Sequence, residues 1–281
     1  MPGDHVPSLS SRLLGRRLRA LREAQGITCD RAAAVLGYEP VWLVQVEIGQ
    51  DPITVDELGR LLDLYVVTDE TARTELVELA GRCGGPTWLR PHVGWLSELE
   101  RDLIILESEA GAIRAYGILL IPDLLRTEAY ARVISTGVRL PTATTTVDQE
   151  LDLLRGRQRH HRKQRPRRRL HVVLDESAIT RHVNDVETMA GQLRYLVEQA
   201  NRDHTTIQLI PREVGAHIGL DGSFHILDFT DPSEPSVSIS HSALGPLLAY
   251  IDLDDRFEKL TKIALGPADS LFMIEQVLSD L

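Results

Sequence analysis

Three side chains suited to acid–base chemistry lie in the second half of the chain, close to the ends of predicted elements. Asp175 and Glu176 come at the end of an apolar strand predicted over residues 170–175, and His217 lies in a glycine-rich loop. A carboxylate beside an imidazole can take up and deliver protons, so these three residues are the candidate catalytic groups. The plainer alternative is that Asp175 and Glu176 cap the following helix and that His217 is an ordinary loop residue.

Four more polar residues of this half are candidates for binding a ligand or a partner. His225 and His241 lie on predicted strands, and Arg157 and Gln158 are suited to an anionic or amide group. The sequence has no phosphate-binding glycine loop and no nucleophile elbow. Its histidines are too dispersed for a metal site. We therefore expect no cofactor and no metal ion.

Length and composition point to an ordinary globular protein of two domains, or of one large one. The chain has 281 residues, of which 43% are hydrophobic and 26% charged, with a formal net charge of −10. No apolar run is long enough for a transmembrane helix, and the N-terminus lacks the pattern of a signal peptide. Cys29 and Cys83 stand far apart and fit no ligand pattern. We expect a cytoplasmic protein without membrane contact.

The positive charge is concentrated in two places. Residues 155–169 contain nine Lys and Arg side chains and no acidic one. A smaller cluster falls on the first predicted helix, at Arg12, Arg16, Arg17, Arg19 and Arg22. Any contact with a polyanion should use these two clusters. The alternative is that both are solvated helix faces.

The first eighty residues predict five short helices. Apolar positions recur at helical spacing over residues 9–25, and glycines or capping residues then delimit helices at 29–36, 40–48, 55–64 and 69–80. Thr28 is suited to cap the second helix. Thr54 and Glu57 have the spacing of a capping box for the fourth. The short turn between the second and third helices is typical of a helix-turn-helix.

This region resembles the XRE (phage-repressor or Cro-like) helix-turn-helix domain over about residues 10–80. The resemblance rests on the stretches at 18–28, 32–37, 46–49 and 58–65, and its most specific element is the turn Glu47-Ile48-Gly49. It implies that the third helix enters the major groove of DNA. It also implies a homodimer, because one helix-turn-helix reads too few base pairs alone.

The third helix has an unusual composition for a reader of DNA. From residue 32 to residue 59 there is no Lys or Arg, but there are five acidic side chains. Gln45 is the one plausible base reader, and the candidate phosphate contacts are Arg16, Arg19 and Arg31. DNA is therefore a possible partner with weakened binding. Trp42 is either an exposed apolar group that packs on a partner or a core residue of the bundle.

The rest of the chain predicts a mixed α/β domain. We expect helices at residues 96–116, 127–134, 147–162, 186–201, 255–265 and 269–278. Strands are expected at 170–175, 206–211 and 224–229, with an edge strand at 236–240. The turn-rich residues 83–86 mark the boundary, which predicts domains at 1–82 and 83–281. The fold class is α+β: an all-α helix-turn-helix bundle followed by a mixed α/β domain.

The second half resembles the DUF5753 domain over about residues 95–280. The segments that carry this resemblance are 121–131, 156–158, 172–179, 189–193 and 210–224. Such domains typically follow an XRE helix-turn-helix in antitoxin-like regulators, often encoded beside a small partner protein. The resemblance implies a transcription regulator whose second domain senses a small molecule or binds a small protein. The alternatives are a pseudo-regulator that has lost DNA binding and binds or transforms a metabolite, and a pure interaction module.

Overall fold

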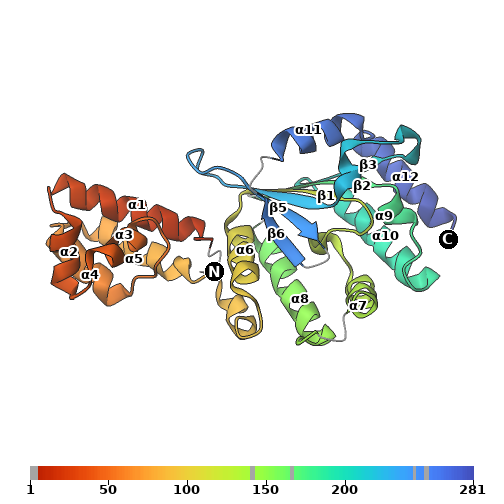
Figure 1. The fold of residues 1–281 in the computed structure, drawn as a ribbon. Helices are drawn as coiled ribbons and strands as arrows, with labels where there is room; N and C mark the ends of the chain where they lie inside the picture. The colour runs from red at the N-terminus through yellow and green to blue at the C-terminus, as the bar shows by residue number, and fades with distance from the viewer. Residues whose placement is uncertain (1–5, 140–142, 165–167, 243–244, 250–252) are drawn as a thin grey trace. The chain divides into compact units, whose positions relative to one another are not determined.

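The computed structural model describes residues 6–139, 143–164, 168–242, 245–249 and 253–281. The chain divides into two compact units, Met1–Glu109 and Ala110–Leu281. The first is entirely helical in its described part, and the second contains a mixed sheet with helices (Figure 1). The expected α+β fold class is therefore confirmed. The domain boundary predicted at residue 83 stays a prediction. The first compact unit extends beyond that residue, to Glu109.

The first five helices of the first unit begin and end close to their predicted positions. They are α1 (Leu9–Ala24), α2 (Cys29–Leu36), α3 (Pro40–Glu47), α4 (Val55–Leu64) and α5 (Glu70–Cys83). The 3₁₀ helix η1 (Thr87–His92), which was not predicted, and α6 (Glu98–Glu109) complete the unit. Thr28 accepts a hydrogen bond from the Arg31 amide at the start of α2. Thr54 and Glu57 form the capping box of α4. The side chains of the core include Leu18, Leu43, Val46, Leu58 and Leu61.

The start of α1 is held by a carboxylate from α6. Both oxygens of Glu109 accept backbone hydrogen bonds there, from the Leu9 amide at 2.7 Å and the Ser10 amide at 3.0 Å. The unpaired amides of a helix N-terminus carry partial positive charge, so a carboxylate is favourable at this point. Burial raises the pKa of Glu109, while these hydrogen bonds favour its charged form. The contact explains why α6 belongs with the helices before it.

The second unit is built on one six-stranded sheet. Its strands are β1 (Ala112–Gly117), β2 (Arg169–Asp175), β3 (Thr205–Ile210), β4 (Phe224–Asp228), β5 (Val237–Ser242) and β6 (Gly245–Ala249). Their order is β3-β2-β1-β4-β5-β6. β1, β2 and β3 are mutually parallel, whereas β4, β5 and β6 continue the sheet in antiparallel pairs. The carboxyl ends of the three parallel strands therefore lie side by side at the same end of the sheet.

Helices cover both faces of this sheet (Figure 1). They are η2 (Asp123–Leu125), α7 (Glu128–Gly137), α8 (Val147–Lys163), α9 (Ser177–Thr180), α10 (Val186–Ala200), η3 (Arg212–Val214), η4 (Ile218–Asp221), α11 (Asp254–Ile263) and α12 (Pro267–Ser279). Phe257 of α11 packs on Tyr116, Val173 and Phe224, which share one face. Figure 1 shows α7 and α8 on the other side of the sheet.

The outer edge of β3 is covered rather than left open. The Leu265 amide donates to the Leu209 carbonyl at 2.8 Å, and the Leu209 amide donates to the Ser270 hydroxyl at 2.9 Å. These bonds use backbone groups that would otherwise offer a pairing edge to another chain.

In the described part of the chain, no helix is both long and apolar enough to cross a membrane.

Two of the predicted elements are wrong. The helix expected over residues 96–116 ends at Glu109, and Ala112–Gly117 form β1 in the interior of the sheet. Its helical spacing runs on through Ala110 and Ile113, but pairing with β2 and β4 decides the conformation. The strand expected at the edge is β5, which pairs on both sides, and the edge belongs to β6.

Candidate functional site

The position of α3 is set by an ion pair inside the first unit. Arg22 of α1 donates from Nε and Nη2 to the two carboxylate oxygens of Glu47, at 2.6 and 2.8 Å. Its Nη1 donates to the Ile27 carbonyl at 2.9 Å, so each guanidinium nitrogen has a hydrogen-bond partner. Both side chains are buried. The hydrogen bond to the Glu47 carboxylate raises the pKa of Arg22 above its usual value. The pair fixes the end of α3 against α1.

Two glycines allow α1 and the end of α3 to approach closely. A Cβ atom on Gly15 would lie 2.4 Å from the Glu47 carbonyl oxygen and 2.6 Å from that of Val46. Gly49 has φ +82°, and a Cβ there would lie 2.9 Å from the backbone nitrogen of Arg12. The turn Glu47-Ile48-Gly49, singled out in the sequence, is therefore the seam between α1 and α3.

The outer side of α3 is apolar. Val41 is 63% exposed, Val44 42% and Ile48 49%. Gln45, the candidate base reader, is partly buried on the same helix. The opposite side of α3 carries Leu43 into the core. A helix in this position of a helix-turn-helix normally presents polar side chains to base edges.

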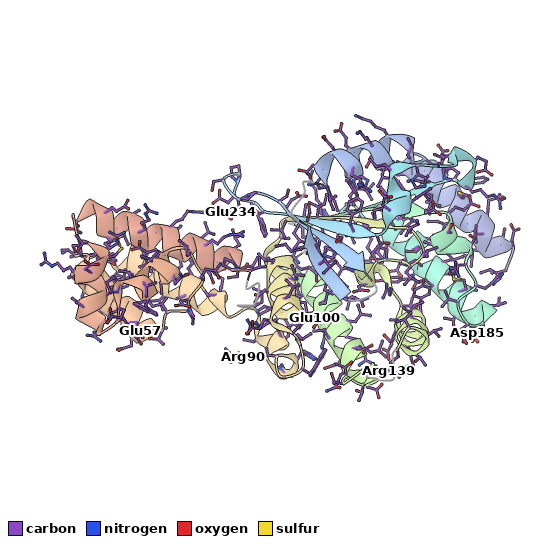
Figure 2. The ribbon with its side chains drawn as sticks, viewed as in Figure 1. Glu57, Arg90, Glu100, Arg139, Asp185 and Glu234 are labelled. Carbon is purple, nitrogen blue, oxygen red and sulfur yellow. The ribbon has the colours of Figure 1, made fainter. Side chains whose placement is uncertain are left out.

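Trp42 belongs partly to the core, as one of the two interpretations expected. It is half-buried and packs against the apolar cluster of the first unit. Its ring stacks on Tyr38 with 4.2 Å between centroids. The Tyr38 hydroxyl donates to Glu57 at 2.7 Å. Glu57, labelled in Figure 2, thus joins the α2–α3 turn to the start of α4.

The candidate phosphate contacts lie on α1 and α2. Arg16, Arg19 and Arg31 are all exposed. Arg19 forms an ion pair with Glu23 one turn further along α1, at 2.8 Å. Such an exposed pair contributes little and leaves the side chain available for other contacts. The DNA-binding roles of these arginines and of Gln45 stay predictions.

In the second unit, the structure brings together two of the three candidate catalytic residues. His217 Nε2 lies 3.3 Å from Asp175 Oδ2, and both side chains are largely buried. The Gly219 amide donates to His217 Nδ1 at 3.1 Å, so the proton of the neutral ring is on Nε2 and is donated to Asp175. Asp175 Oδ1 accepts from the Ser177 amide. Both ring nitrogens have hydrogen-bond partners, and the Asp175–His217 pair holds residues 217–219 against the carboxyl end of β2.

Glu176, the third candidate, points to different partners. Its Oε2 accepts a hydrogen bond from the Arg212 amide at 2.9 Å. The Arg212 side chain approaches the same carboxylate at 3.6 Å. Glu176 therefore ties the end of β2 to the 3₁₀ helix that follows β3, and it does not join the Asp175–His217 pair. Acid–base roles for all three residues stay predictions.

Tyr116 is a member of this site that sequence reasoning missed. Its ring meets that of His217 edge-on, with 6.3 Å between centroids. Its hydroxyl is buried and has no hydrogen-bond partner within the described structure. Burial, and then the nearby Asp175 carboxylate, raise the pKa of Tyr116 well above its usual value. The residue was missed because the sequence predicted a helix where β1 lies.

The two other candidate histidines meet on the opposite face of the sheet. His225 Nδ1 lies 2.8 Å from His241 Nε2, across the β4–β5 pair. Neighbouring side chains of a strand point to opposite faces, and Phe224 packs beside Tyr116 on the α11 face. The His225 side chain therefore points to the other face, away from the Asp175–His217 pair. The structure thus separates the candidate residues into two groups.

Arg157 and Gln158, the remaining ligand candidates, bind the segment around η2. Arg157 pairs with Asp123 at 2.7 Å, as does Arg126 at 2.6 Å. Burial opposes ionisation of Asp123, yet these two guanidinium groups, helped by His241, hold its pKa well below its usual range. The Gln158 amide donates to the Asp123 and Arg126 carbonyls at 2.9 and 2.8 Å. Their ligand-binding roles stay predictions, but both side chains already have internal partners.

The basic run at 155–169 does not form one uniform surface. Arg155 pairs with Glu128 of α7, and Arg168 is buried. Residues 165–167 lie outside the described part of the chain. Among the residues that the structure does describe, no group of three or more His, Cys, Asp or Glu side chains is placed to hold a metal ion.

Taken together, α1 to α4 form the helix-turn-helix fold of DNA-binding transcription regulators, with α2 and α3 as its two central helices. A family model described as "Helix-turn-helix domain" matches residues 13–76. A second model, "Domain of unknown function (DUF5753)", matches residues 100–276, which is more than half of the chain. The chain therefore belongs to the DUF5753 family, and both resemblances noted in the sequence are confirmed. Neither a curated protein nor a solved structure matches it.

Proposed function

We propose that this protein is a transcription regulator of the XRE type. In this proposal the helix-turn-helix unit is the docking head, and the DUF5753 unit binds a small molecule or a small protein. The observation that carries the proposal is the buried Arg22–Glu47 pair, which holds α3 against α1 and leaves its outer side to solvent. This is how a helix-turn-helix presents its recognition helix.

The charges of the unit imply weak DNA binding. Phosphate neutralisation supplies most non-specific affinity, and here the cations come from α1 and α2, at Arg16, Arg19 and Arg31. Gln45 is the candidate for reading a base. A homodimer belongs to the proposal, because two half-sites would raise the affinity that one head lacks.

The test is duplex binding by the full-length chain. Fluorescence anisotropy would compare DNA from upstream of its own gene with an unrelated duplex, at low and moderate salt. We expect Arg31→Ala to weaken both duplexes and to reduce the salt slope by about one. Gln45→Ala should weaken only the upstream duplex, by about tenfold. Arg194→Ala, an exposed arginine of α10, is the matched control. Absence of binding to either duplex at low salt contradicts the proposal.

The second candidate is a regulator that has lost DNA binding and now binds a metabolite. What favours it is the buried hydroxyl of Tyr116, which has no hydrogen-bond partner among the described residues and lies beside Asp175 and His217. These residues lie at the carboxyl ends of parallel strands, where α/β sheets commonly bind ligands. A metabolite panel would be screened by thermal shift of the full chain. A compound that raises the unfolding temperature of the wild type but not of Tyr116→Phe supports this candidate. Salt-dependent duplex binding without any such compound counts against it.

A further inference from the structure

The composition of α3 is that of a helix covered on both sides. Leu43 and Val46 point into the core of the first unit. Val41, Val44 and Ile48 point outward and are exposed. A helix that is apolar all round is normally buried all round. In the described structure α3 is covered on only one side.

The exposed apolar side chains form one stripe. Positions i, i+3 and i+7 lie on the same face of a helix, and Val41, Val44 and Ile48 have this spacing. Tyr38, 44% exposed and stacked on Trp42, extends the stripe beyond the start of α3. We call Tyr38, Val41, Val44 and Ile48 the outer α3 face. Single exposed apolar residues are common, but a contiguous set marks an interaction surface.

The neighbouring helices differ from α3 in this respect. The exposed side chains of α1 include Arg16, Arg17, Arg19 and Glu23, and those of α4 include Asp56, Arg60 and Asp63. These are the charged outer faces expected of an amphipathic helix against solvent. Single exposed valines also occur on α2 (Val35) and at the start of α4 (Val55), but among the described helices of the unit the row of exposed apolar side chains at helical spacing lies on α3 and the turn before it.

The rim of the outer α3 face is acidic. Glu39 precedes the first residue of α3, and Asp51 follows shortly after its end. Asp56 and Glu57 begin α4, and Glu57 bonds the Tyr38 hydroxyl. Although partial burial opposes it, hydrogen bonds from Thr54 and Tyr38 and the nearby Arg60 guanidinium lower the pKa of Glu57, so it is ionised at neutral pH. Arg60 follows directly after residues 32–59 and is the cation next to this otherwise acidic rim.

The acidic rim indicates which kind of partner can bind the outer α3 face. DNA phosphates require cations, and residues 32–59 supply none. A second copy of the same face would bring two acidic rims together, which like-charge repulsion opposes. A protein segment with Lys or Arg beside apolar side chains satisfies both the stripe and the rim. A row at this spacing also packs well against another helix.

We propose that the outer α3 face binds a partner protein through an amphipathic helix whose apolar side chains are flanked by Lys and Arg. The proposal goes beyond DNA binding and does not depend on it, because the arginines of α1 and α2 are not part of the face. It carries one regulatory consequence. While the partner helix is bound, α3 is covered and the head is excluded from the major groove.

The test uses two synthetic helical peptides and the full-length protein. Both peptides have a leucine face; one has arginines at its flanks, and the matched peptide has glutamates. Fluorescence anisotropy should show the arginine peptide binding at least about tenfold more tightly, with affinity falling as salt rises. Because the chain is acidic overall, the decisive comparison is between variants. Val44→Ser should weaken the arginine peptide about tenfold. Val186→Ser, at an exposed valine at the start of α10, should leave it unchanged.

A crosslinking experiment identifies the natural occupant. A photoreactive amino acid would replace Val41, with Val186 as the control site, in cells that express the protein. A crosslink at position 41 to an identified protein, mapped to an apolar and basic segment, supports the proposal. Crosslinks only to DNA or only to a second copy, with no other protein captured at position 41, overturn it, as does the absence of any crosslink. Equal binding of the two peptides, or an unchanged affinity in Val44→Ser, also overturns it.

Discussion

Arg22 of α1 and Glu47 at the end of α3 form a bidentate ion pair in the interior of the helix-turn-helix unit. Two charges taken out of water cost free energy, and only close pairing repays that cost. Here every oxygen of Glu47 and every nitrogen of Arg22 has a close partner. The pair therefore specifies where α3 lies more than it stabilises the unit.

The first prediction concerns the loss of one partner of this pair. Glu47→Ala leaves Arg22 buried without its counter-charge, which we expect to lower the free energy of unfolding of the first unit by about 3–5 kcal/mol. All three tryptophans, Trp42, Trp88 and Trp95, lie in this unit. Their fluorescence during urea denaturation therefore reports on it.

A double variant distinguishes a missing partner from a general loss of packing. Arg22→Met combined with Glu47→Leu removes both charges and fills the space with apolar atoms. We expect it to recover most of the lost stability. A double variant as unstable as Glu47→Ala would show that the charges themselves stabilise the unit.

The second prediction concerns the seam between α1 and α3. Gly15→Ala places a Cβ within 2.4 Å of the Glu47 carbonyl oxygen, and backbone atoms on both sides must shift. We expect a loss of about 1–3 kcal/mol in the same fluorescence measurement. Gly59→Ala, in α4 with open space around its Cβ, is the control and should stabilise by about 0.5–1 kcal/mol. If both variants behaved alike, the close approach would not exist.

The third prediction concerns the backbone above Tyr116. Gly219→Ala would put a Cβ 2.5 Å from the ring of Tyr116, which is buried. We expect scanning calorimetry to show a lower unfolding temperature for the second unit. Gly191→Ala in α10 meets no atom within 4 Å and should have the opposite effect. An unchanged transition in Gly219→Ala would mean that residues 217–219 do not lie on Tyr116.

The fourth prediction concerns alkaline pH. The pKa of Tyr116 is raised in the folded protein, and that of an unfolded tyrosine is about 10. The unfolded state then releases its proton first, so the contribution of Tyr116 to stability is complete below about pH 10 and decreases as pH rises above it. In Tyr116→Phe the decrease should be shallower. Stability at pH 7 should rise by about 1 kcal/mol, because a buried unpaired hydroxyl is removed.

The measurement is calorimetric unfolding of the second unit from pH 7 to above pH 10. Tyr195→Phe, on the partly exposed surface of α10, is the matched control. Loss of stability at pH 7 in Tyr116→Phe would show that the hydroxyl has a partner in solution. Identical alkaline profiles for the two variants would rule out a special contribution from Tyr116.

Local signals predicted most of the first unit. Capping residues such as Thr28 and Thr54 act on amides two or three residues away, so the limits of α2 and α4 follow from sequence alone. The same holds for the buried strand β2, which reads as a short apolar run. β1 was not predictable in this way. Its residues continue a helical spacing, and only the two neighbouring strands hold them extended.

The candidate site of the second unit was likewise predictable only in part from the sequence. Asp175 and His217 were identified from residue type and position, but their contact joins residues 42 apart in the chain. Tyr116 completes the cluster from a strand that the sequence did not predict. His225 and His241 face away from it because the parity of β4 is set by its register with β1.

By itself, the sequence determined the helix-turn-helix, the family of the second unit and the absence of cations on the third helix. These depend on residue types and on contacts within a few positions. Tertiary structure alone decided that Glu47 pairs with Arg22, that the Tyr116 ring meets His217 edge-on, and that Val41, Val44 and Ile48 face solvent. Each of these depends on how distant elements pack, and short-range propensities carry no information about that packing.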